Sequence, residues 1–149
     1  MEQSVTTGEE VIAEVDIPTL EGADLAHSNW RFADLRGISL RGVDLSDSHL
    51  GLADLSGVDL SGAILSRASM CAVILVGARL EGADLRGALL CWARLDGVDL
   101  SQTRLEGTLL RGAYANGTTR WPPGFDATRA RVDLHSRSQD GGHAKTLED

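Results

Sequence analysis

The sequence predicts an all-β solenoid, in which the chain coils around one core and each coil packs only on its neighbours. From Leu20 to Leu110 every fifth residue is a large apolar side chain, without a slip in phase. Of these nineteen positions seventeen are Leu, and the other two are Trp30 and Met70. Neither the 3.6-residue period of a helix nor the two-residue period of a strand produces this spacing.

A second observation defines the repeating unit. A small residue lies two positions before most of the large ones, Asp often precedes the large residue directly, and Gly often follows two positions after it, as in Ala83–Gly87. One large and one small residue per unit would point inward and the other three would face water. Gly, Ser and Asp suit a chain that turns at every unit.

A third observation is a longer period of 20 residues. Two columns spaced by 20 consist of glycine: Gly22, Gly42, Gly62 and Gly82 in one, and Gly37, Gly57, Gly77 and Gly97 in the other. The equivalent column on a third face contains Phe32, Leu52, Ala72 and Trp92. A plain five-residue repeat would not sort glycines in this way, so four units make one coil.

These A-D-L-x-G units resemble the pentapeptide-repeat family, whose signature is A-(D/N)-L-x-x. The match covers nineteen consecutive units, from Pro18 to Gly112. The resemblance implies a right-handed quadrilateral β-helix of just under five coils. We therefore expect the β-helix at residues 18–112, with a cap at each end because an open solenoid end exposes apolar groups.

Residues 1–17 are expected to form an acidic N-terminal cap. They carry five acidic side chains and no Lys or Arg. Within them, Glu9–Val15 is predicted to form a short helix or strand, with Val11, Ile12 and Val15 plugging the first coil. Whether this segment caps the solenoid or covers its side is left open by the sequence.

Residues 113–135 are expected to form the C-terminal capping segment, and 136–149 a disordered polar tail. The apolar period fails at Ala115, and aromatic residues and prolines follow. The predicted cap residues are Tyr114, Trp121, Pro122, Pro123 and Phe125. A recognition loop around Trp-Pro-Pro is the alternative to a hydrophobic plug. Similar W/F-P-x-G-F-D closures in other pentapeptide-repeat proteins favour the plug.

Composition narrows the partners and the compartment. The net charge is −8, and an acidic balance argues against direct nucleic-acid binding, which usually shows a basic stripe. No segment approaches the roughly 20 apolar residues of a membrane helix, and no signal-peptide apolar region is present. We therefore expect a cytoplasmic protein that does not bind membranes.

The third face is predicted to be an interface, because its outward columns form a contiguous apolar stripe. The predicted interface residues are Phe32, Leu52, Ala72, Trp92, Leu89 and Leu109. Either a second copy, giving a homodimer, or a terminal segment would cover them. Cys71 and Cys91 stack on the same face and are expected to be free thiols in a reducing compartment.

The acidic columns are a second candidate surface, formed by Asp24, Asp34, Asp44, Asp54 and Asp59. Like charges one coil apart repel unless hydrogen bonds to turn backbone offset the repulsion, or the patch is kept for a partner. Asp59, Arg79 and Asp99 alternate in sign along another column, so neighbours could pair.

The sequence contains no constellation for catalysis and implies no cofactor and no metal. There is no phosphate-binding glycine loop, zinc-type cysteine spacing or nucleophile elbow. His27 and His49 lie near Asp47 in the predicted stack, but Asp47 is expected to be an ion-pair partner of His27 and Arg67 rather than a metal ligand.

We therefore expect a non-enzymatic protein-interaction module: a rigid rod that presents one face to a protein partner or a second copy. The alternative comes from the family resemblance, since some members mimic duplex DNA, bind DNA gyrase or topoisomerase IV and protect them from quinolone-type inhibitors in antibiotic resistance. The acidic balance suits that alternative. The short rod, the nine Arg residues of the solenoid and the absence of Phe at the large positions argue against it.

Overall fold

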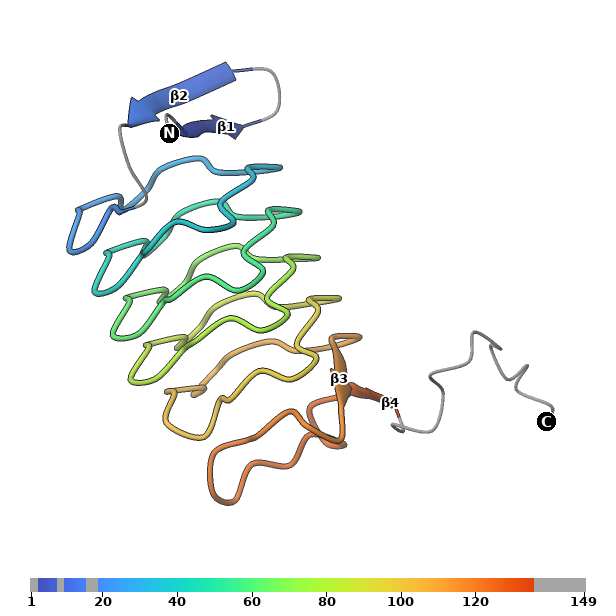
Figure 1. The fold of residues 1–149 in the computed structure, drawn as a ribbon. Helices are drawn as coiled ribbons and strands as arrows, with labels where there is room; N and C mark the ends of the chain where they lie inside the picture. The colour runs from blue at the N-terminus through green and yellow to red at the C-terminus, as the bar shows by residue number, and fades with distance from the viewer. Residues whose placement is uncertain (1–2, 8–9, 16–18, 136–149) are drawn as a thin grey trace, which may run out of the picture.

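The computed structural model describes residues 3–7, 10–15 and 19–135, and its central part is a right-handed quadrilateral β-helix (Figure 1). The coils stack in parallel, and each has four short sides separated by turns. Four longer strands are β1 (Gln3–Thr7), β2 (Glu10–Val15), β3 (Tyr114–Asn116) and β4 (Asp133–His135). The predicted fold is thus confirmed.

Parallel pairing between residues 20 apart holds the coils together. The paired residue is the one directly before the large apolar position, as in Asp24↔Asp44 and Asp34↔Asp54. Backbone hydrogen bonds connect each coil to the next, for example from Leu50 N to Ser69 O at 2.7 Å. The period of 20 that the glycine columns indicated is therefore the length of one coil.

Each corner of the coil is a tight turn. The amide of the small residue donates to the carbonyl of the preceding large residue, as Ala53 N does to Leu50 O at 3.1 Å. The residue two positions after the large one has a positive φ, which is +69° at Gly62. A type II turn requires this left-handed conformation at its third residue, and glycine adopts it without steric cost.

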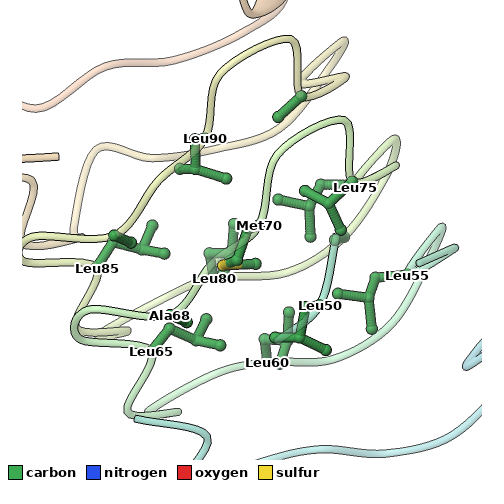
Figure 2. Packing of buried hydrophobic residues seen from close by; sticks show 14 of the residues in the cluster. Leu50, Leu55, Leu60, Leu65, Ala68, Met70, Leu75, Leu80, Leu85 and Leu90 are labelled. Atoms are coloured by element: carbon green, nitrogen blue, oxygen red, sulfur yellow. The ribbon is translucent and has the colours of Figure 1, made fainter. Parts of the chain in front are cut away.

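The interior is a stack of leucine layers (Figure 2). Leu50, Leu55, Leu60 and Leu65 are fully buried, and Met70 continues the stack without a gap. Burying each such side chain contributes about 1.5–3 kcal/mol relative to leaving it exposed. Because the interior contains one large residue from every side of every coil, the continuity of this stack stabilises the rod.

At the N-terminal end, β1 and β2 form an antiparallel hairpin. The segment predicted as a short helix or strand is thus a strand at Glu10–Val15. The side chains of Val11, Ile12 and Val15 lie outside the described residues, as does the predicted tail at 136–149. No helix in the described part of the chain is both long and apolar enough to span a membrane.

At the C-terminal end, the parallel pairing continues beyond the last large residue of the period. Asp99 pairs with Arg120, 21 residues further on, so one extra residue enters the last coil. β3 and β4 then pair in parallel. The Trp121 and Phe125 rings stack with centroids 4.9 Å apart, and both pack partly buried against the core.

Candidate interaction surface

The column Phe32, Leu52, Ala72 and Trp92 lies along one corner of the coil. The sequence predicts these residues on the third face, and the structure places each of them as the third residue of a turn, at the corner that bounds that face. We call these four residues the apolar corner. Phe32 is 55% exposed, Leu52 49% and Trp92 58%, and Ala72 is half-buried. The corner is therefore a ridge of large apolar side chains that reach into solvent.

All four residues of the apolar corner have a positive φ, between 58° and 63°. For a residue with a Cβ the left-handed conformation costs roughly 1–2 kcal/mol, and a bulky residue rarely adopts it. The glycine columns accommodate the same turn without this cost. The side chains of the apolar corner are thus retained despite both exposure and backbone strain.

One further corner also carries residues other than glycine, and it differs in chemistry. There His27, Asp47 and Arg67 have positive φ values. Asp47 and Arg67 form a two-point ion pair, with Nε to Oδ1 at 2.8 Å and Nη2 to Oδ2 at 2.7 Å. The predicted pairing of Asp47 with Arg67 is confirmed. At that corner, contacts within the chain therefore explain why these positions are not glycine.

Two contacts hold the aromatic rings at the ends of the apolar corner. The indole of Trp92 lies over Gly112 in the next coil, where an added Cβ would come within 2.7 Å of Trp92 Cδ1 and Nε1. At the other end, the Arg31 guanidinium carbon lies 5.4 Å from the centroid of the Phe32 ring, a cation–π distance. The rings are therefore oriented before any partner binds.

The apolar surface extends from this corner onto both adjoining sides. Leu109 is 54% exposed and pairs with the half-buried Leu89 on the side that precedes the corner. Tyr114, in β3, is 37% exposed and pairs with Arg94 on the side that follows it. The sequence had placed Tyr114 in the cap, because it lies beyond the apolar period. Its 20-residue offset from Arg94 is the signal that could have placed it here.

Hydrogen bonds within the turns offset the repulsion between the stacked aspartates. Asp24 Oδ1 accepts from Ala26 N at 3.2 Å, and Asp44 Oδ1 accepts from Ser46 N at 3.0 Å and from Ser46 Oγ at 2.6 Å. The hydrogen bonds of Ser46 lower the pKa of Asp44. Each such carboxylate caps the turn that follows it, which is the structural alternative that the sequence left open.

Arginines neutralise much of the remaining acidic surface. Arg36 lies 2.7 Å from Asp34 and 3.6 Å from Asp54, and its hydrogen bond holds the pKa of Asp34 below the ordinary value. Arg41 lies 3.3 Å from Asp59.

The expected pairing along Asp59, Arg79 and Asp99 is wrong, although these residues do stack. Asp59 instead pairs with Arg41 and Asp99 with Arg120, at 3.3 Å and 3.6 Å. Asp59 thus pairs with an arginine in the turn that follows Ser39, its stacked neighbour in the preceding coil, whereas Asp99 pairs with Arg120, the residue that stacks on it.

The described residues contain no group of three or more His, Cys, Asp or Glu side chains arranged to hold a metal. Cys71 and Cys91 are both free and half-buried. Burial raises the pKa of the Cys71 thiol, and the neighbouring Cys91 raises it further. The surface thus consists of an apolar corner, a largely neutralised set of turn carboxylates and a pair of thiols.

Comparison with known proteins identifies the repeat. The family model described as pentapeptide repeats matches in eight copies, over residues 20–57, 53–90, 74–112 and 93–119. A pentapeptide repeat protein from Nostoc Pcc 7120 is 35% identical, with 79% of this chain and 85% of that one covered and a TM-score of 0.37. No curated protein sequence matches the chain.

Two other solved structures show how far the likeness extends. A pentapeptide repeat protein from the Arabidopsis thaliana thylakoid lumen is 24% identical, with 76% of this chain and 73% of that one covered and a TM-score of 0.52. A plasmid-mediated fluoroquinolone resistance protein is 20% identical, with 78% and 82% covered, but its TM-score of 0.33 supports no functional argument. The family match spans residues 20–119, and this chain belongs to the pentapeptide-repeat family.

Proposed function

We propose that the chain is a non-enzymatic interaction module whose binding surface is the apolar corner together with Leu89 and Leu109. Pentapeptide-repeat proteins are structural repeat folds and generally not enzymes. The observation that carries the proposal is that Phe32, Leu52 and Trp92 project into solvent from left-handed turns. The fold needs only a positive φ at these positions, and glycine would provide it.

Two features of the apolar corner are unfavourable in the free protein, its exposed apolar area and its strained backbone, and a bound partner can offset both. Exposed apolar area is returned to an apolar environment at about 25 cal/mol per Å² when a partner covers it. Backbone strain in the free protein is a cost that binding can offset, and strained residues cluster at functional sites. Aromatic side chains each bury a large area, which is why they dominate interface energetics. Those already fixed in position also lose little entropy on binding.

Site-specific photo-crosslinking from the corner tests the proposal. A photoreactive amino acid replaces Leu52 in the full chain, which is irradiated in the cells that express it. We expect a discrete adduct, and its mass distinguishes a second copy from another protein. Arg67 is the matched control position, because it occupies the same turn position on a different corner and also has a positive φ.

A second variant distinguishes specific binding at the apolar corner from nonspecific crosslinking. Phe32→Asn with Trp92→Asn removes the aromatic surface while retaining a residue type that tolerates the left-handed conformation. In this background the adduct from position 52 should be lost. Equal adducts from positions 52 and 67, or an adduct that persists in the double variant, would overturn the proposal.

The DNA-mimic reading is retained as a second candidate, because Asp24 and Asp44 stack and neither has an ion pair among the described residues. Its test is gyrase supercoiling during titration with the protein, with and without a fluoroquinolone. Inhibition or drug protection that disappears on reversing Asp24 and Asp44 supports the mimic. No effect at protein concentrations on the order of tens of micromolar, well above the Kd expected of a specific complex, removes it.

A further inference from the structure

Cys71 and Cys91, the two cysteines of the chain, occupy neighbouring positions in one column. Both are the second residue of a turn, just before a residue of the apolar corner. Leu52 N donates to Cys71 O at 3.1 Å, and Ala72 N donates to Cys91 O at 2.8 Å. These bonds fix the two turns in register, so the Cα atoms of the two cysteines are one coil spacing apart, about 4.8 Å. In the free protein the Cys91 thiol donates to Leu109 O at 4.0 Å.

This spacing is unfavourable for a disulfide. A disulfide needs an S–S distance of about 2.05 Å and Cβ atoms about 3.8 Å apart. Parallel side chains in register hold their Cβ atoms near the coil spacing of about 4.8 Å, so closure would compress the stack by about 1 Å. Backbone hydrogen bonds on both sides of the pair resist that compression.

The same spacing suits one soft metal ion between two sulfurs. A zinc–thiolate bond is about 2.3 Å long, and two bonds of that length end to end span about 4.6 Å. Thiolates select soft ions, and Cu(I) is the first-row example that accepts two ligands in a line. The coil spacing of a β-helix thus matches the distance between the donors of a two-coordinate Cu(I) site.

The surroundings also suit an anionic complex of this kind. Gly51 lies below Cys71 in the column, and the Arg31 side chain extends over it, with Nε 3.9 Å from where a Cβ would be. Arg111 follows Cys91 in the column, and its carbonyl accepts from Trp92 N at 3.1 Å. A copper dithiolate carries one net negative charge, and an arginine lies on each side of the pair.

We propose that Cys71 and Cys91 form a two-coordinate site for a soft monovalent metal cation, Cu(I), on the flank of the apolar corner. Binding replaces the two thiol protons: one Cu(I) and two thiols give a copper dithiolate and release two protons, with no change in oxidation state. Both thiols are half-buried, so the ion enters from solvent without opening the fold. Because its two ligands lie 20 residues apart in the sequence, such a site cannot be recognised from a short sequence motif.

The test is anaerobic titration of the reduced full-length protein with Cu(I), in competition with a chromogenic Cu(I) chelator. We expect one Cu(I) per chain, with a thiolate-to-copper absorption band and quenching of Trp92 fluorescence. Cys71→Ser and Cys91→Ser should each weaken binding about 10²–10⁴-fold, because each removes the effective-concentration advantage of paired donors. Circular dichroism verifies that every variant is folded.

Moving the pair along the column tests the geometry itself. Cys91→Ser with Gly51→Cys restores two adjacent thiols one coil earlier, and the new Cβ meets only ordinary contacts, 3.6 Å from Cys71 O. This variant should regain tight binding. Cys91→Ser with Arg111→Cys leaves the thiols two coils apart, about 9.6 Å, and should not.

Three results would overturn the proposal. The first is binding of similar strength in the single-cysteine variants, and the second is two Cu(I) ions per chain. The third is equal binding by the adjacent and the separated pairs. In each case the thiols would act independently of the stacking that defines the site.

Discussion

The glycine column Gly22, Gly42, Gly62 and Gly82 and the apolar corner occupy equivalent positions in the same coils. Both follow the large apolar residue of the period by two positions, and both lie in turns with a positive φ. The first column meets the requirement of the turn with the residue that has no Cβ. The second meets it with Phe, Leu and Trp, at a cost in backbone strain. The comparison separates what the fold requires from what the surface adds.

The largest loss of stability that we expect comes from substitutions in the core beneath the two columns, and it should be the same for each column. Leu50, which precedes Leu52, and Leu60, which precedes Gly62, are both fully buried. Replacing either by Ala should lower the free energy of unfolding by about 2–5 kcal/mol, through lost burial and the cavity left behind. Urea titration of the two variants measures this. If the losses of unfolding free energy in Leu50→Ala and Leu60→Ala differ by more than about half of the larger one, the two columns differ in the core beneath them and not only at the surface.

The next effect distinguishes two glycines at the same turn position. A Cβ at Gly62 meets nothing within 4 Å, so Gly62→Ala should cost only the left-handed conformation, about 1–2 kcal/mol. Gly112→Ala should cost about 1–3 kcal/mol more, because the new methyl displaces the Trp92 indole that lies 2.7 Å away.

Trp92→Asn in the Gly112→Ala background isolates the contact between them. The total cost of Gly112→Ala should then fall to that of Gly62→Ala. Thermal melts of the unchanged protein, the two single variants and the double variant complete a double-mutant cycle. If the coupling is absent, the indole does not lie over Gly112 in solution.

A smaller effect, which should differ between two substitutions of Leu52, tests the backbone strain. Leu52→Asn should change the free energy of unfolding by less than about 1 kcal/mol, because Asn tolerates the left-handed region and Leu52 is 49% exposed. Leu52→Val should destabilise by about 1–2 kcal/mol, because a β-branched residue fits that region poorly. Equal stability of these two variants in chemical denaturation would show that backbone strain at position 52 contributes nothing measurable.

The smallest effect that we expect is on the pH dependence of stability, through ion pairs on the sides of the coil next to the two columns. The side-chain hydrogen bonds of Arg36 and Arg86 hold the pKa values of Asp34 and Asp84 below the ordinary 3.8. The folded state therefore binds fewer protons than the unfolded state in acid. The stability these groups contribute is complete above about pH 4 and is lost as the pH falls through the folded pKa values.

Melting temperatures measured from neutral pH to about pH 2 follow this loss. In the variant Arg36→Gln with Arg86→Gln, the pKa values of Asp34 and Asp84 should return toward the ordinary 3.8, so the fall should be shallower. The same acid sensitivity in both proteins would show that these exposed pairs do not stabilise the fold.

The sequence by itself determined the coil. A fixed period of five places one large residue inward per side, and the period of 20 assigns every outward residue to a column. The stacking of Asp24 on Asp44 and of Leu89 on Leu109 follows from that arithmetic, as does membership of the apolar corner. These features need only the backbone period, which is why they could be predicted.

Only the tertiary structure decided the directions and contacts of the side chains. It placed Phe32 and Trp92 in the turns at a corner, from which their side chains project into solvent. It paired Asp59 with Arg41 rather than Arg79: Arg41 lies in the turn that follows Ser39, the residue stacked on Asp59 in the preceding coil. It also set the Trp92 indole over Gly112. A column number gives the height and the side of a residue, but rotamers and turn geometry decide which neighbour its side chain meets.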